Sequence, residues 1–467
     1  MKKLFLLSVA LLCSGLIVAQ EMSKKEAKGQ EYRRSSLAMI LMEDPNMDPA
    51  IIGAVRSTFE KSQAPKKFND HNLDGYRMFV PAEKATEDEL ALFEEVNPVK
   101  KQSFGASLGK GLLSLATAQE DGSGDVTAYI EEQKRITREF GALAYKYLIE
   151  NKLPLLAMEK WFNVNPTDTM NLALIEDRGL TAKRPQELAD LSNAVNWQEQ
   201  LTDYGYDLIG NTFLAVSRYR YMTYDEFAEE MSKEADAMTG GLGLADLTKS
   251  VTDLGSLVSK GDKHSYVITV RTFLFQLIWD EETENGVKDN YKNLEAFRNV
   301  PFKLKYLGQE KSNSNVGKTP NLTPEEVAFL GVEMPAEEGE KPKLTNDQIV
   351  ELATRRAFDK SIAKLEKKNE AFHIKSPLIV DENGQFFAEI GTYDSVEGKD
   401  KYEVLEEVYD EKTNRTKYVR LGVLTVDPKN IWDNDPESEN YQEVGKTLLV
   451  GKVKNAYTGC LIRRTKK

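Results

Sequence analysis

The chain has few of the residues from which metal sites and disulfides are built. It contains 2 cysteines and 3 histidines in 467 residues. The histidines, His71, His264 and His373, are far apart, and none belongs to a His-Glu-x-x-His motif or has a cysteine nearby. We therefore expect no zinc site and no metal or other cofactor. Cys13 lies in an apolar N-terminal run, and we interpret Cys460 as a buried apolar residue near a strand end.

Beyond its first residues the chain has no apolar run of the roughly 20 residues that a membrane-spanning helix needs. The N-terminus has Lys2 and Lys3, an apolar run from Leu4 to Val18, and Ala19 before a polar start. This pattern predicts a cleavable signal peptide over residues 1–19. We expect an exported protein that is periplasmic or associated with an outer membrane. Removal of Cys13 with the signal would leave one cysteine, which excludes an intramolecular disulfide.

Positive charge is also in deficit. The formal net charge is -13, and loss of Lys2 and Lys3 with the signal takes it to -15. Such a surface is poorly suited to binding nucleic acid or anionic lipid broadly, so we expect no nucleic-acid partner.

Motifs for nucleotide binding, hydrolysis and calcium binding are incomplete. Three glycine-lysine stretches imitate phosphate loops, but each lacks a residue that the loop needs. The chain has no Gly-x-Ser-x-Gly elbow. A calcium loop would need a central glycine that an alternating acidic run lacks. We predict a solvated acidic loop for that run, which consists of Asp433, Asp435, Glu437 and Glu439.

Two aromatic and aliphatic stretches, residues 206–221 and 266–279, organise the predicted fold. Their composition is typical of buried strands, and helical patterns flank both. We expect them to form the centre of a mixed sheet in an α/β domain over residues 126–309. Residues 20–125 are expected to be mostly helical and partly flexible.

Helices are predicted from apolar periodicity and start signals. The expected helices cover residues 35–42, 86–96, 136–147 and 185 onward, and a capping box of Thr223 and Glu226 predicts another from Tyr224 to about Ala237. Residues 121–124 are predicted to form a short flexible linker. A polar linker is predicted over residues 310–343, with one short helix after Thr323, and residues 344–372 are predicted as a longer helix.

The C-terminal region, residues 373–467, alternates in hydropathy between closely spaced turns, which predicts a small antiparallel barrel. The chain is thus placed in the α+β class: a central mixed α/β domain followed by a helix and a small C-terminal antiparallel β-barrel. The predicted strands are 373–380, 386–390, 402–409, 418–426, 447–453 and 460–463.

One group of charged residues is a candidate ligand-binding site. Glu176, Asp177 and Arg178 follow the apolar run 172–175, at a position where α/β sheets often carry ligand-binding residues. The alternative, which we favour, is an ion pair that orients the turn. No catalytic residue is predicted.

Two glycine-rich apolar stretches, 104–118 and 239–247, leave two interpretations open. Residues 104–118 in particular could make a peripheral contact with a membrane or a partner. Equally, both stretches fit mobile loops whose few leucines fold back, and we prefer this interpretation.

Two segments resemble known families of bacterial envelope proteins. Residues Glu397–Glu407 and Arg420–Val426 resemble the C-terminal barrel of flagellar-assembly-T-type proteins, although Lys399 separates the glycine from the aspartate of the motif. Ile175–Gly179, a helix, and Leu208–Phe213 follow an order that is similar to the α/β domains of the TolB N-terminal and curli-secretion kind. Both resemblances imply non-enzymatic assembly parts of Gram-negative envelopes.

Taken together, the sequence favours a non-enzymatic exported envelope protein that acts as a scaffold or interaction component, with other envelope proteins as partners. A secreted hydrolase that uses carboxylates, with an acidic cleft around Glu176, Asp177 and Asp207, is the main alternative. A glycan-binding module is another, with tryptophans as platforms, although core packing is the more frequent use of such residues. The tryptophans are Trp161, Trp197, Trp279 and Trp432.

Overall fold

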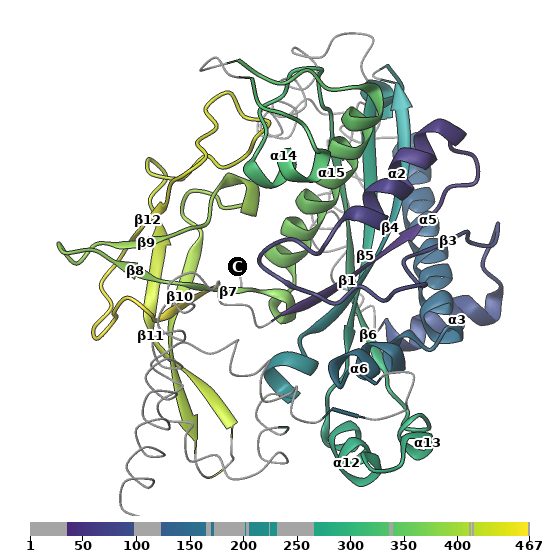
Figure 1. The fold of residues 1–467 in the computed structure, drawn as a ribbon, viewed down its shortest axis with the longest axis horizontal. Coiled ribbons are helices and arrows are strands. Elements are labelled where there is room, and N and C mark those ends of the chain that lie inside the picture. Colours follow the sequence, from purple (N-terminus) through teal and green to yellow (C-terminus); the bar gives the residue numbers. More distant parts are fainter. Residues whose placement is uncertain are drawn as a thin grey trace, which may run out of the picture.

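The computed structural model describes residues 35–97, 123–164, 170–171, 201, 205–223, 225–230, 266–335, 340–410, 412 and 415–465. The described chain forms two lobes (Figure 1). Residues up to 372 build the first, which we call the sheet lobe, and residues 373–465 build the second, which we call the barrel.

The sheet lobe is built around a six-stranded mixed sheet, sheet A. Its main strand order is β2-β1-β4-β5-β6, and β3 also pairs with β1. β1 is parallel to β2, β3 and β4, whereas β4, β5 and β6 form an antiparallel meander. The strands are β1 (Ser36–Met42), β2 (Asn69–Asp70), β3 (Met78–Phe79), β4 (Thr212–Thr223), β5 (Tyr266–Leu277) and β6 (Leu304–Ser314).

The two apolar stretches that were predicted to organise the fold are β4 and β5, which are direct neighbours. The prediction of a mixed sheet is therefore confirmed. The chain makes a five-residue π-helix, η2 (Gly205–Ile209), before β4 begins.

Helices cover both faces of sheet A because its strands alternate their buried side chains. Leu214 and Phe275 belong to the core on one face, where α3, α5, α6, α12 and α13 pack. Phe213 and Leu274 belong to the core on the other face, with α2, α14 and α15. The helices are α2 (Pro49–Lys61), α3 (Glu87–Val96), α5 (Ser123–Glu150), α6 (Leu153–Trp161), α12 (Glu281–Asn290), α13 (Leu294–Phe297), α14 (Pro324–Leu330), α15 (Asn346–Lys368) and the 3-10 turn η4 (Glu370–Phe372).

The predicted helix over residues 35–42 is wrong, because this segment is strand β1. All seven of its residues are buried. Leucine, alanine and methionine favour a helix locally, but a run buried on every side fits a strand with helices on both faces. Tertiary burial therefore overrides local propensity here.

Helix starts were predicted more accurately than strand β1, because a capping box forms between residues that are close in sequence. Thr86, Thr323 and Thr345 each form the complete capping box at the start of α3, α14 and α15. Thr223 and Glu226 exchange the expected hydrogen bonds, and residues 225–230 are helical. The rest of that predicted helix, and the one from 185 onward, lie outside the described residues.

Two stretches of linker-like composition belong to regular elements. Helix α5 begins at Ser123, inside the predicted 121–124 linker, because serine, glycine and aspartate are also typical of helix starts. Strand β6 extends to Ser314, into the range assigned to the 310–343 linker. Ser314, at the polar end of this strand, donates a hydrogen bond to Glu437 of the barrel.

The barrel is a seven-stranded antiparallel sheet, sheet B, with the order β7-β13-β10-β11-β12-β9-β8. β7 and β8 stand at opposite ends of this order, yet Leu378 alone separates them in the chain. The sheet must therefore curl until its ends nearly meet, which confirms the predicted barrel. Its elements are β7 (Lys375–Pro377), β8 (Ile379–Val380), β9 (Phe386–Ala388), the 3-10 turn η5 (Thr392–Asp394), β10 (Lys401–Asp410), β11 (Arg415–Val426), β12 (Thr447–Val450) and β13 (Leu461–Arg464).

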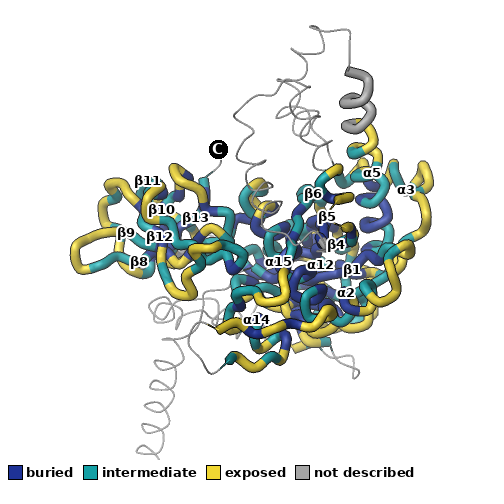
Figure 2. Tube along the Cα trace, turned by 90° about the horizontal axis from the view of Figure 1, so that it is seen from above, coloured by how far each residue is buried: buried dark blue, intermediate teal, exposed yellow. Residues whose placement is uncertain are grey.

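The barrel has its own core, in which Cys460 is fully buried, as expected of an apolar structural cysteine. Buried residues fill both lobes, while exposed residues gather on the barrel loops and the outer helices (Figure 2). None of the helices in the described residues combines the length and apolar character that crossing a membrane requires.

Candidate functional site

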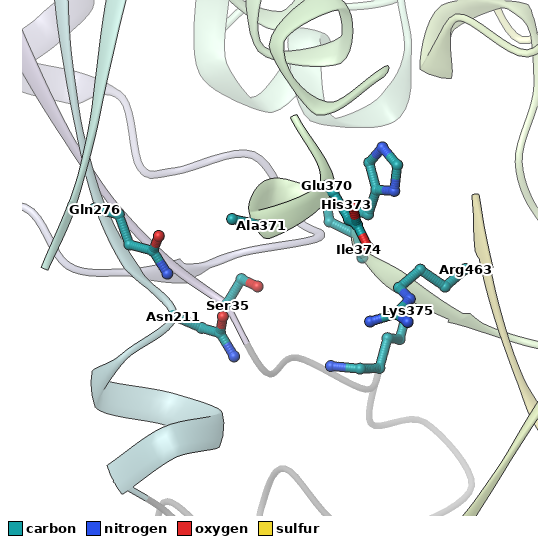
Figure 3. Close-up of a pocket in the computed structure, with 9 residues that line it drawn as sticks. All are labelled: Ser35, Asn211, Gln276, Glu370, Ala371, His373, Ile374, Lys375 and Arg463. Atoms are coloured by element: carbon teal, nitrogen blue, oxygen red, sulfur yellow. The ribbon is translucent and has the colours of Figure 1, made fainter. Parts of the chain in front are cut away.

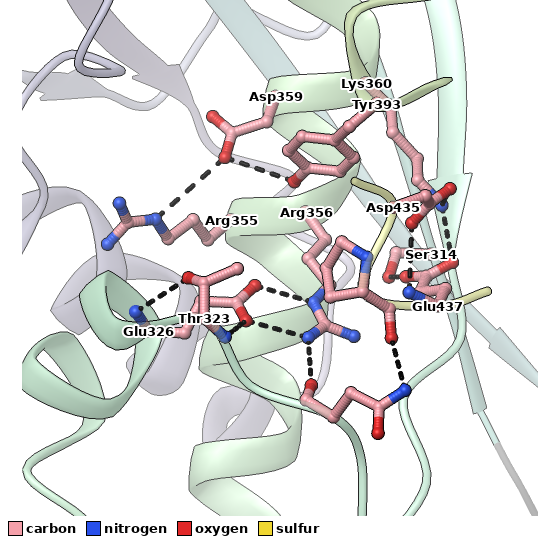
Figure 4. A network of polar contacts seen from close by, with 12 residues as sticks. Ser314, Thr323, Glu326, Arg355, Arg356, Asp359, Lys360, Tyr393, Asp435 and Glu437 are labelled. Carbon is pink, nitrogen blue, oxygen red and sulfur yellow. Dashed lines mark hydrogen bonds and ion pairs between the residues drawn. The ribbon is translucent and has the colours of Figure 1, made fainter. Parts of the chain in front are cut away.

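Helix α15 lies between sheet A and the barrel and holds the two lobes together (Figure 1). Its apolar face, including Leu352 and Ala357, is buried against the sheet lobe. Charged residues further along contact the barrel. We call the contacts made by Asp359, Lys360, Tyr393, Asp435 and Glu437 the docking network (Figure 4).

Lys360 is the main cation of the docking network. Its ammonium lies 2.5 Å from a carboxylate oxygen of Glu437 and 3.5 Å from one of Asp435. Burial opposes ionisation of Glu437, but Lys360 and Arg356 outweigh it and lower the pKa of this carboxyl. The ion pair is therefore maintained at neutral pH.

A second ionic contact lies at the other end of this interface. Lys67, which follows α2, binds Glu366 of α15 at 3.0 Å and Asp394 of the barrel at 3.2 Å. Burial disfavours the charged ammonium, but the two carboxylates outweigh it and raise the pKa of Lys67. Lys367 of α15 also pairs with Glu397 of the barrel at 2.6 Å. The lobes are thus joined by charged contacts along the length of the helix.

A buried ion pair supports this interface from inside the sheet lobe. The guanidinium of Arg356 donates to both carboxylate oxygens of Glu326, at 2.7 and 2.8 Å, and to the carbonyl of Asn321 at 2.6 Å. The Asn321 amide in turn donates to the carbonyls of Pro436 and Ser438 in the barrel. Arg356 therefore orders the segment against which the barrel loop rests.

Asp359 is the least favourably placed charge at the interface. It accepts a hydrogen bond of 3.3 Å from the Tyr393 hydroxyl, and Arg355 lies 4.0 Å away. Burial raises the pKa of Asp359 to about 6, and the nearby carboxylate of Glu326 adds to the shift against the opposing effect of Arg355. The protonation of Asp359 thus changes close to neutral pH.

The acidic run was predicted as a solvated loop, and that prediction is wrong for Asp435 and Glu437, which bind Lys360. Asp433 accepts an exposed hydrogen bond of 2.8 Å from the Thr392 hydroxyl. Glu439 is exposed. Among the described residues, no group of three or more potential metal-binding side chains is present. The run serves as a docking loop.

A polar cavity of about 170 Å³ lies where the lobes meet (Figure 3). Ser35, Asn211 and Gln276 line its sheet side, while His373, Lys375 and others line the opposite side. Ser35 and His373 stand on opposite walls of the cavity (Figure 3). Burial lowers the pKa of His373.

Several groups of this cavity are bound to the protein itself. Arg463 donates to Glu403 at 2.6 Å, and Gln276 donates to the carbonyl of Gly210 at 2.7 Å. The Asn211 amide donates to the carbonyl of Asp207 at 2.9 Å. The cavity has room for ordered water or a small polar molecule.

The strongest candidate for a binding surface is the hairpin of β10 and β11. β13 pairs with β10 only over Tyr402–Leu405, and β12 pairs with β11 only at Thr425 and Val426. Beyond these points the two strands pair only with each other in the described structure. We call this part, β10 from Glu406 to Asp410 and β11 from Arg415 to Leu421, the free hairpin.

One face of the free hairpin carries two exposed valines beside Glu406 and Lys417. Val408 and Val419 are 42% and 45% exposed. Their cross-strand partners are Lys417 and Glu406 respectively, which places both valines on the same face. Exposed valines beside strand edges that pair with no other described strand are features of a surface that accepts another chain.

The other face of the free hairpin is anchored to the sheet lobe. The hydroxyl of Tyr418 donates to the Asp207 carboxylate at 3.0 Å, and the Lys375 ammonium lies 4.2 Å from the centre of the Tyr418 ring. These contacts fix the direction of the hairpin relative to sheet A. The valine face lies on the opposite side of the strands from Tyr418 and is consequently turned away from Asp207.

The residues predicted from sequence as a ligand site, Glu176, Asp177 and Arg178, lie outside the described residues. The same holds for the glycine-rich stretches 104–118 and 239–247. Asp207, which the hydrolase alternative places in an acidic cleft, is hydrogen-bonded to Tyr418 instead.

The tryptophans within the described chain are largely structural. Trp161 and Trp279 are buried, and the Trp161 indole donates to the Thr212 hydroxyl at 2.9 Å. Trp432 donates to the carbonyl of Gln442 at 2.8 Å and packs against Gly445. Trp197 lies outside the described residues. The preference for core packing is confirmed for Trp161 and Trp279.

Comparison with known proteins identifies no family whose model matches this chain and no curated protein that is similar to it. The function is therefore inferred from the geometry of the molecule.

The sequence predicted the strands of the free hairpin but not that their edges extend beyond the neighbouring strands. An alternating strand shows no sign of how far its neighbours extend, because strand length is set by tertiary pairing.

Proposed function

We propose that the protein is an exported, non-enzymatic component of a cell envelope that binds another envelope protein through the free hairpin of its barrel. The observation that carries the proposal is that the free hairpin pairs with no further strand among the described ones and carries two exposed valines. Extended chains add to such edges by main-chain hydrogen bonding, with side-chain contacts providing the specificity.

The arrangement of the lobes supports a role as a scaffold. The docking network and the Tyr418–Asp207 hydrogen bond hold the barrel at one orientation on the sheet lobe. A rigid mounting lowers the conformational entropy lost when a partner binds. The sheet lobe would thus present the hairpin, while the hairpin makes the contact.

The proposal is tested by affinity capture from the envelope of the cells that produce the protein. The informative variant carries Val408→Asp and Val419→Asp, which replaces the two exposed valines of the free hairpin by charged residues. Its matched control carries Val80→Asp and Val444→Asp, at positions that are 61% and 86% exposed and lie outside the hairpin.

We expect mass spectrometry to identify a partner that is retained by the wild type and the control and lost by the hairpin variant. Equal capture by all three proteins would refute a role for the hairpin. Export is tested separately by fractionation, with N-terminal sequencing of the mature chain. An uncleaved cytoplasmic chain would contradict the envelope assignment.

A further inference from the structure

The polar cavity between the lobes, which we call the interlobe cavity, has two cations on its barrel side. Lys375 of β7 and Arg463 of β13 are direct cross-strand partners, so their side chains stand on the same face of sheet B. The two side chains end next to each other in the cavity (Figure 3). Like charges in such a pair repel each other, and an anion placed beside both relieves that repulsion.

Arg463 has donors beyond those that it uses within the protein. Its Nε donates to one oxygen of Glu403 at 2.6 Å, and its Nη2 lies 2.6 Å from the same oxygen. A guanidinium has five N–H donors, and neither contact involves Nη1. Lys375 already contacts the ring of Tyr418, so what it contributes to the cavity is its charge. A carboxylate of a ligand therefore finds donors on Arg463 and a second positive charge beside them.

The sheet side of the interlobe cavity offers acceptors instead. The amide nitrogens of Asn211 and Gln276 donate to the carbonyls of Asp207 and Gly210. Within the described chain, no donor is directed to the carboxamide oxygen of either residue. Each of these oxygens accepts up to two hydrogen bonds. This wall is therefore suited to a donor such as an ammonium group.

The charges around the interlobe cavity balance. Two cations, Lys375 and Arg463, stand against two carboxylates, Glu370 in the lining and Glu403 on Arg463. His373 is uncharged at neutral pH because burial lowers its pKa. A charge removed from water is costly unless it is paired, so a ligand with an excess of one charge fits this balance poorly. A molecule with one positive and one negative group preserves it.

The volume of the interlobe cavity restricts the ligand to a small molecule. Pockets for drug-sized ligands measure about 300–1,000 Å³. The interlobe cavity, at about 170 Å³, is smaller than that range. The docking network holds the two lobes together, so both walls are in place before a ligand arrives. Such preorganisation lowers the entropic cost of binding.

We propose that the interlobe cavity binds a small zwitterionic amino acid. Its carboxylate is held by Arg463 beside the charge of Lys375. Its ammonium is held by the carboxamide oxygens of Asn211 and Gln276, within the field of Glu370. This binding activity goes beyond the proposed function, because none of these residues belongs to the free hairpin.

The test is isothermal titration calorimetry of the full-length protein with glycine, alanine and serine. Acetate and methylamine, which carry the carboxylate and the ammonium alone, are titrated in parallel. We expect at least one of the amino acids to bind at least about tenfold more tightly than either fragment, because it makes charge-assisted hydrogen bonds at both walls. Tryptophan, which is too large for the cavity, should not bind. Absence of binding by all three small amino acids, or equal affinity for acetate, would overturn the inference.

Two arginine variants locate the carboxylate end. Arg463→Met removes its donors, so we expect the affinity for the amino acid to fall about tenfold or more. Arg420→Met is the matched control, since Arg420 also lies near Glu403, at 3.8 Å, but does not line the cavity. It should bind the amino acid like the wild type. Equal affinity in Arg463→Met and the wild type would contradict the assignment.

A third variant locates the ammonium end and does not depend on Arg463. Gln276→Met has a similar length but lacks the carboxamide oxygen, so we expect it to weaken binding of the amino acid while leaving the weaker binding of acetate unchanged. Thermal unfolding without ligand shows whether each variant folds. If Gln276→Met binds the amino acid like the wild type, the proposed orientation of the ligand is wrong.

Discussion

Replacement of Asp359 by asparagine should stabilise the protein at neutral pH. The carboxyl is held at the lobe interface with a pKa of about 6, against 3.8 for its ordinary value. At about 1.36 kcal/mol per pKa unit, this difference corresponds to about 3 kcal/mol of unfavourable free energy above pH 6. Asparagine has nearly the same shape, carries no charge and still accepts the hydrogen bond from Tyr393.

The sign of the pH dependence follows from linkage. Because the folded pKa is raised, the destabilising contribution of Asp359 is fully present above pH 6 and disappears as the pH falls toward 4. The attraction to Arg355, 4.0 Å away, opposes this shift and is already included in the pKa of about 6. We therefore expect Asp359→Asn to be about 2–3 kcal/mol more stable than the wild type at pH 7.5 and nearly equal to it at pH 4.

Urea unfolding of the wild type and the variant at pH 4, 5, 6 and 7.5 measures this difference. Asp347→Asn, at an exposed position in the first turn of α15, is the control for removal of one negative charge. A stability difference for Asp359→Asn that does not depend on pH, or a variant that is less stable at pH 7.5, would refute the reasoning about the interface.

Two further substitutions test the packing and ion pairing of the sheet lobe. Arg356→Ala leaves the buried carboxylate of Glu326 without its partner, so we expect urea unfolding to show a free energy of unfolding that is about 3–5 kcal/mol lower. A decrease below about 1 kcal/mol would contradict the buried pair. Gly205→Ala would place a methyl group 2.5 Å from the Trp279 indole, and we expect about 1–3 kcal/mol of destabilisation together with a changed tryptophan fluorescence spectrum. An unchanged melting temperature would show that the indole moves freely.

The parts of the fold that depend on neighbours in sequence could be predicted. Thr345 and Gln348 are three residues apart, so their capping box is visible in the sequence. The barrel strands were predicted for the same reason, since turns such as Asn383–Gly384 end one alternating segment and begin the next. Strand β1 was not, because its burial on both faces comes from elements far away in the chain.

The interface and the free hairpin lie beyond this kind of prediction. Lys360 and Glu437 are 77 residues apart, and nothing in either segment indicates the other. The acidic run around Glu437 has the composition of a solvated loop, and only the approach of α15 gives it a partner. Ion pairs of this kind depend on tertiary geometry, which carries no local sequence signature.

The most direct test of the central claim is crosslinking in the intact envelope from a photoreactive residue placed at position 419. The control is the same residue at position 444, which is more exposed but lies outside the free hairpin. We predict one identifiable covalent adduct from position 419 and none from position 444. Adducts of equal yield from both positions, or an adduct from position 444 alone, would contradict partner binding through the hairpin.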